Sequence, residues 1–213
     1  MKFIGWLGTV SMVFVFLLLS APVILKAKKA SERTEAINNI KQISTMLIEF
    51  DSEYGTFPDA STVTDVRDTT SSTLTLDDSS SNKLFRQLLL GRKDSSEKPF
   101  YAEIPGSRRP DDIFNTDATA LRKGECGFAY IVGQHGSGDP DIPVVMTEML
   151  PGKPLFSTKN KFVGKAVVLR LDSSATSLQI DPSGHALAPK GGDLLAPSQP
   201  YWKGKAPNIK WQE

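Results

Sequence analysis

The segment FDSEYGTFPD, from Phe50 to Asp59, has the composition of a helix end. Before it, apolar residues recur at spacings of three and four and so share one face of a helix; they are Ile37, Ile40, Ile43, Leu47, Phe50 and Tyr54. Gly55 can take the positive φ that terminates a helix, and Pro58 prevents a restart. The sequence therefore predicts an amphipathic helix over 30–55, with Tyr54 and Phe57 inserted into the core beneath its end.

An uncharged apolar segment precedes this helix. The sequence FIGWLGTVSMVFVFLLLSAPVIL runs from Phe3 to Leu25 without a charged residue. At about 1.5 Å per residue, a helix of this length covers the roughly 30 Å of hydrocarbon in a bilayer. A cleaved signal peptide, the alternative, has an apolar core of only about 7 to 15 residues. We therefore expect 1–29 to be a retained membrane anchor with a basic flank, kinked at Pro22.

Composition limits the remaining possibilities. The 213 residues, 39% of them hydrophobic, suit one domain with an appendage. The 25 Lys and Arg residues nearly cancel the 24 Asp and Glu residues, so we expect no nucleic-acid partner. The single cysteine, Cys126, cannot form an internal disulfide and is expected to be a small buried side chain.

The globular part, 30–213, divides into four segments. The amphipathic helix is followed by a tract rich in Ser, Thr and Asp over 61–82, which is expected to be an exposed loop. The stretch 83–181 begins with a short helix, KLFRQLLLG, capped by Asn82 or a preceding serine. The last segment, 182–213, is rich in Gly and Pro and is predicted to be irregular.

Four short stretches of β-branched and aromatic residues predict strands. They are CGFAYIVG (126–133), IPVVMTEM (142–149), KAVVLRLD (165–172) and ATSLQI (175–180). A turn at RLDSSATS pairs the last two as an antiparallel hairpin. The predicted fold class is α+β, with a long N-terminal helix packed on a small antiparallel sheet.

An apolar N-terminal span that continues into a helix ending in EYGTFP resembles the type IV pilins and type II secretion pseudopilins. Later segments are similar to the secretion protein G-like chains of Verrucomicrobia and Planctomycetes. These segments are SSNKLFRQLLLG, SEKPFYAEIPG, CGFAYIVG, PVVMTEM and GKAVVLRLDSSATSLQI. The resemblance is strongest over 36–58 and 80–180.

The resemblance implies a pilin-like structural subunit of a type II secretion or type IV pilus-like assembly, and no enzymatic activity. It implies one span of the bacterial inner membrane, a periplasmic C-terminal domain, and partners that are other pilin-like subunits and an assembly platform. The anchor and assembly residues are then Phe3, Gly5, Gly8, Met12, Leu19, Pro22, Ile24 and Ile37.

Two features of the chain depart from this family. Prepilins carry Gly followed by Phe or Met, and a Glu five residues into the mature chain, whereas here Trp6 follows Gly5, Thr9 follows Gly8, and the span lacks acidic residues. N-terminal processing and methylation are therefore left open. Lys26, Lys28, Lys29 and Arg33 after the span favour a cytoplasmic domain by the positive-inside rule. The alternative function is a solitary membrane-anchored extracytoplasmic binding module that does not assemble.

The polar residues form no catalytic pattern. The two histidines, His135 and His185, lie in Gly-rich turns without partners at ligand spacing, so neither an enzyme nor a small-molecule substrate is expected. Hard oxygen atoms that suit calcium come from one loop, at Ser137, Asp139 and Asp141. Major pseudopilins bind calcium in a C-terminal loop, so the resemblance adds to this hypothesis; a simple Gly/Asp turn is the alternative. No other cofactor is expected.

Overall fold

The structure is a computed structural model that describes the backbone of residues 2–213 and the side chains of residues 24–213. Its helices are α1 (Lys2–Tyr54), α2 (Val63–Thr70) and α3 (Ser81–Leu90), with 3₁₀ turns η1 (Lys98–Phe100) and η2 (Pro200–Trp202). Its strands are β1 (Ala129–Ile131), β2 (Pro143–Thr147), β3 (Lys165–Arg170), β4 (Ala175–Gln179) and β5 (Ile209–Lys210). Six of the predicted anchor residues lie outside the described side chains: Phe3, Gly5, Gly8, Met12, Leu19 and Pro22.

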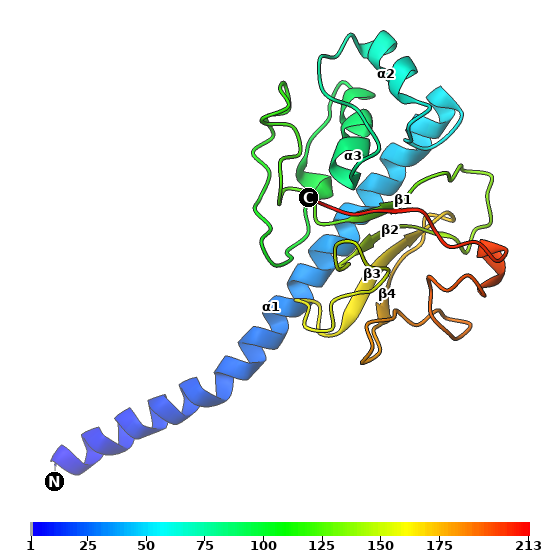
Figure 1. Ribbon diagram of the computed structural model, residues 1–213. Coiled ribbons are helices and arrows are strands. Elements are labelled where there is room, and N and C mark those ends of the chain that lie inside the picture. Colours follow the sequence, from blue (N-terminus) through cyan, green and yellow to red (C-terminus); the bar gives the residue numbers. More distant parts are fainter. Residues whose placement is uncertain (1) are drawn as a thin grey trace.

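The strands form one sheet in the order β4-β3-β2-β1-β5, and each neighbouring pair is antiparallel. The predicted hairpin is present, since Leu169 of β3 pairs with Ala175 of β4. Helix α1 packs across one face of this sheet (Figure 1), with α3 beside it. The α+β class and the long helix on an antiparallel sheet are thus confirmed, and the arrangement is consistent with a pilin-like fold.

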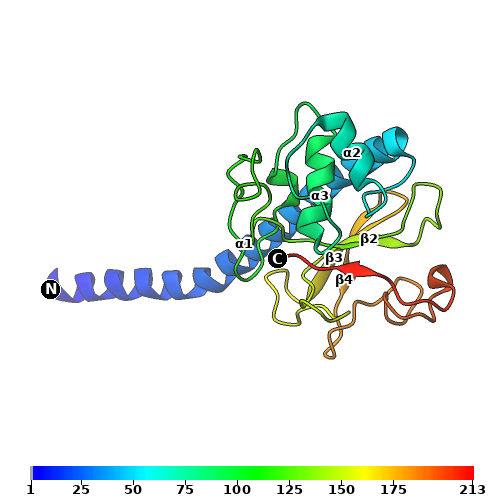
Figure 2. The same cartoon turned by 45° about the horizontal axis from the view of Figure 1, so that its top comes forward.

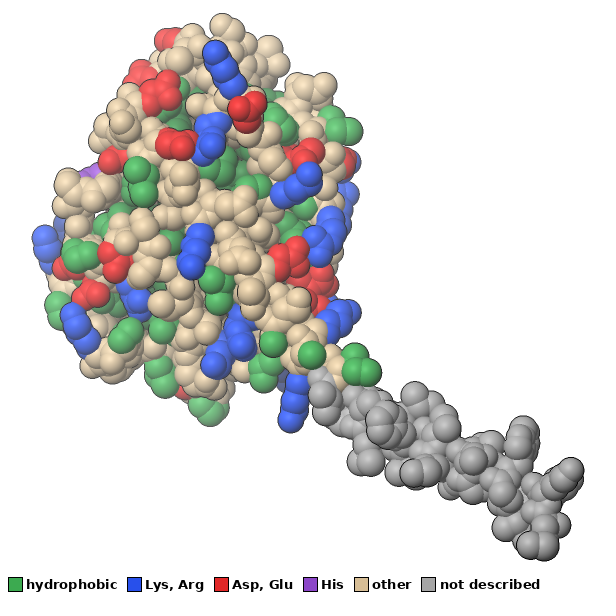
Figure 3. All heavy atoms as spheres, turned by 180° about the vertical axis from the view of Figure 1, so that it is seen from behind, with side chains coloured by type: hydrophobic (Ala, Val, Ile, Leu, Met, Phe, Trp, Pro, Cys, Tyr) green, Lys and Arg blue, Asp and Glu red, His purple; other side chains and the backbone are tan. Residues whose placement is uncertain are grey.

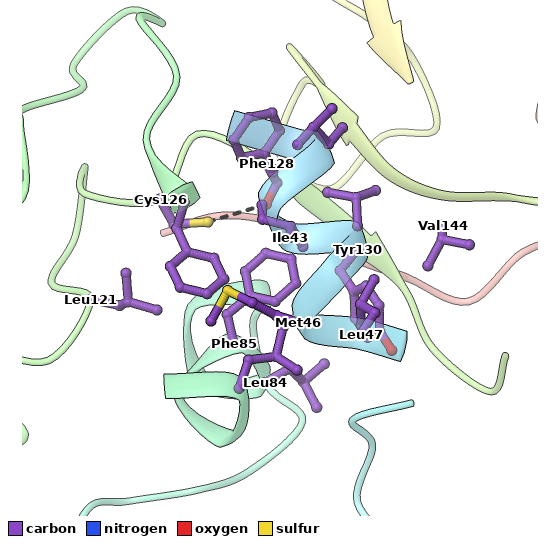
Figure 4. Packing of buried hydrophobic residues seen from close by; sticks show 14 of the residues in the cluster. Ile43, Met46, Leu47, Leu84, Phe85, Leu121, Cys126, Phe128, Tyr130 and Val144 are labelled. Atoms are coloured by element: carbon purple, nitrogen blue, oxygen red, sulfur yellow. Dashed lines mark hydrogen bonds between the residues drawn. The ribbon is translucent and has the colours of Figure 1, made fainter. Parts of the chain in front are cut away.

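The first hydrophobic core lies between α1, α3 and the sheet. Ile40, Ile43 and Leu47 of α1 are at most 1% exposed, which is the buried face that the periodicity predicts. Figure 4 shows α1 and α3 converging here on Tyr130 of β1. The ring of Phe85 in α3 lies 5.4 Å from that of Tyr130, so aromatic packing joins this helix to the sheet.

The second core lies on the opposite face of the sheet. Successive residues of a strand point to opposite faces, so Val167 faces the first core while Ala166 and Val168 face the second. Leu194, Leu195 and Trp202 from the C-terminal segment cover this second face. The sheet is therefore enclosed between α1 and the last thirty or so residues of the chain.

The tract 61–82 differs from the predicted exposed loop. It contains α2, and Val66, Leu74 and Leu76 are at most 4% exposed in the first core. The hydroxyls of Thr69 and Thr70 donate to the carbonyls four residues before them, so they are satisfied within the helix. The burial of these few apolar side chains is enough to order a tract whose overall composition is polar.

The segment 182–213 is also more ordered than its predicted irregular form. It contains η2 and β5, and Ile209 pairs with Ile131 of β1. Its last residues are hydrogen-bonded to the first turn of α3. The Ser81 amide donates to the Trp211 carbonyl (3.0 Å), and the Glu213 amide donates to Asn82 Oδ1 (3.0 Å). A strand of two residues has too short a pattern to be recognised from sequence.

The short helix α3 forms as predicted and begins at Ser81, two residues before the predicted start at Lys83. The Ser80 side chain accepts a hydrogen bond of 3.2 Å from the Lys83 amide, which is an N-cap. Asn82, the other predicted cap, lies inside the helix and donates to the Leu121 carbonyl (2.8 Å). The cap is therefore the preceding serine.

Candidate assembly surface on helix α1

The part of α1 nearest the apolar segment extends beyond the sheet (Figures 1 and 2). Ile24 is 63% exposed and Leu25 is 60% exposed, and Lys26, Lys28 and Lys29 are exposed after them. Figure 3 shows basic and hydrophobic side chains gathered where α1 leaves the domain. Large exposed apolar side chains that adjoin a continuous apolar run mark a surface suited to lipid or to another helix.

Polar contacts fix the next turns of α1 to the domain. Arg33 Nη1 donates to the Phe162 carbonyl at 3.5 Å, and Glu35 accepts from Arg109 Nη1 at 2.8 Å. The guanidinium of Arg109 also lies 4.8 Å from the ring centre of Tyr101, within cation–π range. Asn39 Nδ2 donates to the Tyr101 carbonyl at 2.9 Å. From Arg33 onward, α1 is therefore part of the domain.

The apolar stripe of α1 is divided between these two regions. Ile40 and the residues after it on the stripe are buried in the domain, except for half-buried Tyr54, whereas Ile37 is half-buried at the boundary. Ile37, the one stripe residue among the predicted assembly residues, is therefore only partly accessible. On the outward side of α1 within the domain, Ile48 is 54% exposed among polar neighbours. Among the described side chains of α1, the exposed apolar pair next to the predicted span is Ile24 and Leu25.

The helix exit, from Tyr54 to Pro58, fixes the C-terminal end of α1 to the domain. Gly55 has φ of 76°, and its amide donates to the Asp51 carbonyl at 2.8 Å. Phe57 and Pro58 are buried, and the Phe57 amide donates to the Gln134 carbonyl at 3.3 Å. Tyr54 is half-buried, with its ring 4.4 Å from that of Phe50. Phe57 therefore lies in the first core and Tyr54 packs against it, whereas Gly55 is exposed.

The predicted calcium loop contains other polar contacts. Ser137 Oγ lies 2.9 Å from His135 Nδ1, and Asp139 Oδ1 accepts from the Asp141 amide at 3.0 Å. Asp141 Oδ2 accepts from Lys190 Nζ at 2.6 Å, and this pair lowers the pKa of Asp141. Asp139 and Asp141 line a shared cleft, which Ser137 does not. Among the described residues, no three His, Cys, Asp or Glu side chains gather as a metal site.

The cysteine occupies the first core. Cys126 is fully buried, and its Sγ donates to the Phe128 carbonyl at 3.4 Å (Figure 4). Burial raises the pKa of its thiol to about 12, so the reactive thiolate is scarce at neutral pH. The expected role as a small buried side chain agrees with this environment.

Sequence inspection missed a set of buried ionisable side chains. They come from α3, from loops and from strand ends and are at most 8% exposed; they are Arg86, Glu97, Glu125, Glu148 and Arg170. Arg86 is satisfied, because its guanidinium donates to the carbonyls of Ala120 and Thr75 and to the Asp117 carboxylate. Composition gives no signal for such residues, since charged side chains are ordinarily exposed.

No protein-family model, curated protein or solved structure matches this chain. In the part of the chain with described side chains, no helix is both long enough and apolar enough to span a membrane. The expected span, from Phe3 to Leu25, falls almost wholly on residues 1–23, outside that part.

Proposed function

We propose that this chain is a membrane-anchored pilin-like or pseudopilin-like subunit with a structural role in a type II secretion or type IV pilus-like assembly. Its place would be the bacterial inner membrane, with the domain after Lys26 on the periplasmic side. In this role the protein would transmit force along α1 to neighbouring subunits and would catalyse no reaction. Its partners would be other pilin-like subunits and the assembly platform.

One observation supports this proposal above others. Ile24 and Leu25 are exposed at the point where α1 leaves the domain, and the uncharged run from Phe3 leads directly into them. Two contacts of Arg33 and Glu35 then hold the helix to the domain. An apolar helix fixed to a folded domain suits packing against the same segment of another subunit, because apolar helix surfaces associate by close contact.

The exposed basic residues fit a membrane-proximal position. Lys26 and Lys29 have exposed side chains, and Lys28 lies 3.8 Å from Glu32. Near a bilayer surface such lysines attract anionic headgroups. The same lysines are the residues by which the positive-inside rule opposes the proposed orientation.

Cysteine crosslinking tests the assembly role. In a filament, staggered neighbours would bring the region from Met12 to Leu19 of one subunit near the region from Ile24 to Ile37 of the next. Pairs such as Leu19→Cys with Ile24→Cys, in a Cys126→Ser background, should crosslink between subunits in cells that make the assembly machinery. Lys203→Cys, exposed in the C-terminal segment, is the control that should not crosslink to Leu19→Cys.

The same experiment distinguishes the alternative. A solitary anchored binding module with a pilin-like fold would be membrane-bound and folded but would give no crosslink at any pair. The absence of an acidic residue from the span favours this alternative, since pilins use that residue to position a new subunit. Crosslinks that form only in cells with the assembly machinery would exclude the solitary module.

A further inference from the structure

A cleft lies on the side of the sheet away from α1, between β3 and the C-terminal segment. Its volume is about 150 Å³. A cavity of about 150 Å³ accommodates a benzene-sized molecule, so a ligand of roughly six to eight non-hydrogen atoms fits. The lining combines Arg170 of β3 with residues of the loops around it; these are Asp139, Asp141, Ala188, Pro189, Lys190, Leu194, Gln199, Pro200 and Tyr201.

Arg170 is a buried cation in this cleft without an acidic partner. It is 8% exposed, and its Nη1 makes one long hydrogen bond, 3.4 Å, to Thr176 Oγ1. Within the described part of the chain, its Nη2 is shielded from solvent and has no hydrogen-bond partner, and no carboxylate lies within 4.0 Å of its guanidinium. A buried guanidinium that no anion contacts directly is unfavourable, because it has lost its water without gaining a partner.

The carboxylates of the cleft are engaged elsewhere. Asp141 pairs with Lys190 at 2.6 Å, and Asp139 Oδ1 accepts from the Asp141 amide at 3.0 Å. Lys190 is 81% exposed, so this ion pair lies at the rim of the cleft while Arg170 lies inside it. The chain therefore places a cation in the cleft and does not neutralise it by direct contact.

The wall opposite β3 is apolar and rigidly held. The Leu194 carbonyl accepts from Tyr201 Oη at 2.8 Å and from Trp202 Nε1 at 3.0 Å. Gln199 Nε2 donates to the Gly191 and Asp193 carbonyls at 2.9 and 3.0 Å. These bonds fix the two loops that form the wall, so the cleft is preformed. Preformed apolar clefts with a few placed polar groups are typical small-molecule sites.

We propose that this cleft binds the carboxylate of a small apolar acid, with the carboxylate on Arg170 and the apolar body against Leu194, Ala188 and Tyr201. A planar carboxylate matches the fork of a guanidinium and can accept two parallel hydrogen bonds. Asp139 and Asp141 disfavour a dianion such as phosphate, because like charges would lie close together. A single negative charge on a small apolar body is the chemistry that fits the whole lining.

Binding of 3-methylbutanoate to the full chain tests the proposal. Isothermal titration calorimetry in detergent micelles at pH 8, with empty micelles as the blank, should give saturable binding. The neutral isostere 3-methylbutanamide has the same shape without the charge and should bind at least tenfold more weakly, as should inorganic phosphate. A peptide ending in leucine, compared with its C-terminally amidated form, distinguishes a protein carboxyl terminus from a free acid as the source of the carboxylate.

Two variants identify the residues responsible. Arg170→Leu should weaken binding by about ten- to a hundredfold, the usual effect of losing a charge-assisted pair of hydrogen bonds. It should not lower the melting temperature of the unliganded protein, because it removes a buried unpaired charge. Ala188→Phe keeps Arg170 but fills the cleft, and should abolish binding. The matched control is Arg67→Leu, which removes an exposed arginine from α2 and should bind as the parent does.

Three results would overturn the proposal. The first is a parent protein that shows no saturable binding of 3-methylbutanoate up to millimolar concentrations. The second is equal binding of the acid and the amide, which would mean that charge is not recognised. The third is unchanged binding in Arg170→Leu or, if that variant does not fold, in Ala188→Phe.

Discussion

The hydroxyl of Tyr130 donates a hydrogen bond of 3.0 Å to the carbonyl of Pro58. Tyr130 lies in β1 and is fully buried, and Pro58 follows the end of α1. Burial raises the pKa of the Tyr130 phenol well above its ordinary value, so the hydroxyl stays a donor at any ordinary pH. One side chain thus connects the helix exit to the sheet.

Tyr130→Phe should lower the free energy of unfolding by about 1 to 2 kcal/mol, because the buried Pro58 carbonyl loses its donor while the packing is kept. Denaturant unfolding of the full chain measures the change. Tyr201→Phe is the matched control and should have a smaller effect, since Trp202 still donates to the carbonyl that Tyr201 contacts. Equal effects of the two variants would contradict a special role for the Tyr130 bond.

Phe57→Ala should lower the free energy of unfolding by about 3 to 4 kcal/mol, the usual range for a buried phenylalanine. Phe57 is 5% exposed, whereas Tyr54 is only half-buried, so Tyr54→Ala should have a smaller effect. The control is Ile48→Ala on the exposed face of α1, which should change stability by no more than about 0.5 kcal/mol. A Phe57→Ala variant as stable as the parent would favour a recognition role for this aromatic residue.

Gly55→Val should destabilise the domain by about 1 to 2 kcal/mol through the backbone alone. Gly55 has φ of 76°, and no atom lies within 4 Å of the position of an added Cβ, so strain and not collision is the cause. Gly55→Asn should be milder, because Asn tolerates the left-handed region. Thermal unfolding of both variants separates the two explanations: equal losses would point to lost flexibility or contacts instead of positive φ.

Glu97 should make the domain less stable as pH rises through neutrality. Burial raises its pKa from 4.5 to about 7, and Glu125, Asp111 and Asp112 act in the same direction. A raised pKa means that the folded state holds the proton more tightly, so the stabilisation is complete below about pH 4.5 and is lost as pH approaches and passes 7. Glu97 Oε2 has no partner among the described residues to stabilise its charge.

Glu97→Gln should therefore remove part of the pH dependence between pH 5 and 7 and should stabilise the protein at pH 8, by about 1 to 3 kcal/mol. Glutamine retains the oxygen that accepts from the Leu121 amide at 2.6 Å. Urea unfolding across this pH range is the measurement, with Glu53→Gln on the exposed end of α1 as control. Parallel pH profiles for the parent and Glu97→Gln would show that Glu97 does not titrate in this range.

A reporter fused after Glu213 should be active only outside the cytoplasm if the proposed orientation holds. Glu213 contacts Ser80 and Asn82, so a flexible linker is needed to keep these contacts. Paired reporters that work only in the periplasm or only in the cytoplasm give opposite readouts. Activity of the cytoplasmic reporter alone would support the positive-inside rule and reject the periplasmic domain.

The helix and strand pattern could be predicted from sequence because each element carries its own signal. The stripe from Ile40 to Phe50 and the four β-rich stretches are local patterns, and each gave an observed element. Helix α2 could not be predicted in this way, because its single buried residue, Val66, is hidden among Ser, Thr and Asp. Its helix depends on a core supplied by distant parts of the chain.

The sequence around each residue of the cleft gives even less indication of the cleft than it does of α2. Asp139 and Asp141 were visible as an acidic loop, but Arg170 appears in the sequence as an ordinary charged end of a strand. Only the fold brings β3 against the segment that contains Leu194 and Tyr201. The unsatisfied guanidinium is a property of the assembled tertiary structure, and no residue spacing encodes it.

The pairing of β5 with β1, and of Glu213 with the start of α3, has a consequence for biogenesis. These contacts join residues 209–213 to β1 and to the first turn of α3, which lie far earlier in the sequence. During synthesis, therefore, the sheet lacks an edge strand until this last part of the domain has emerged. Long-range pairing of this kind makes folding slow and leaves apolar surface uncovered in the meantime. A chain with these contacts would need protection from aggregation until its last residues have been synthesised.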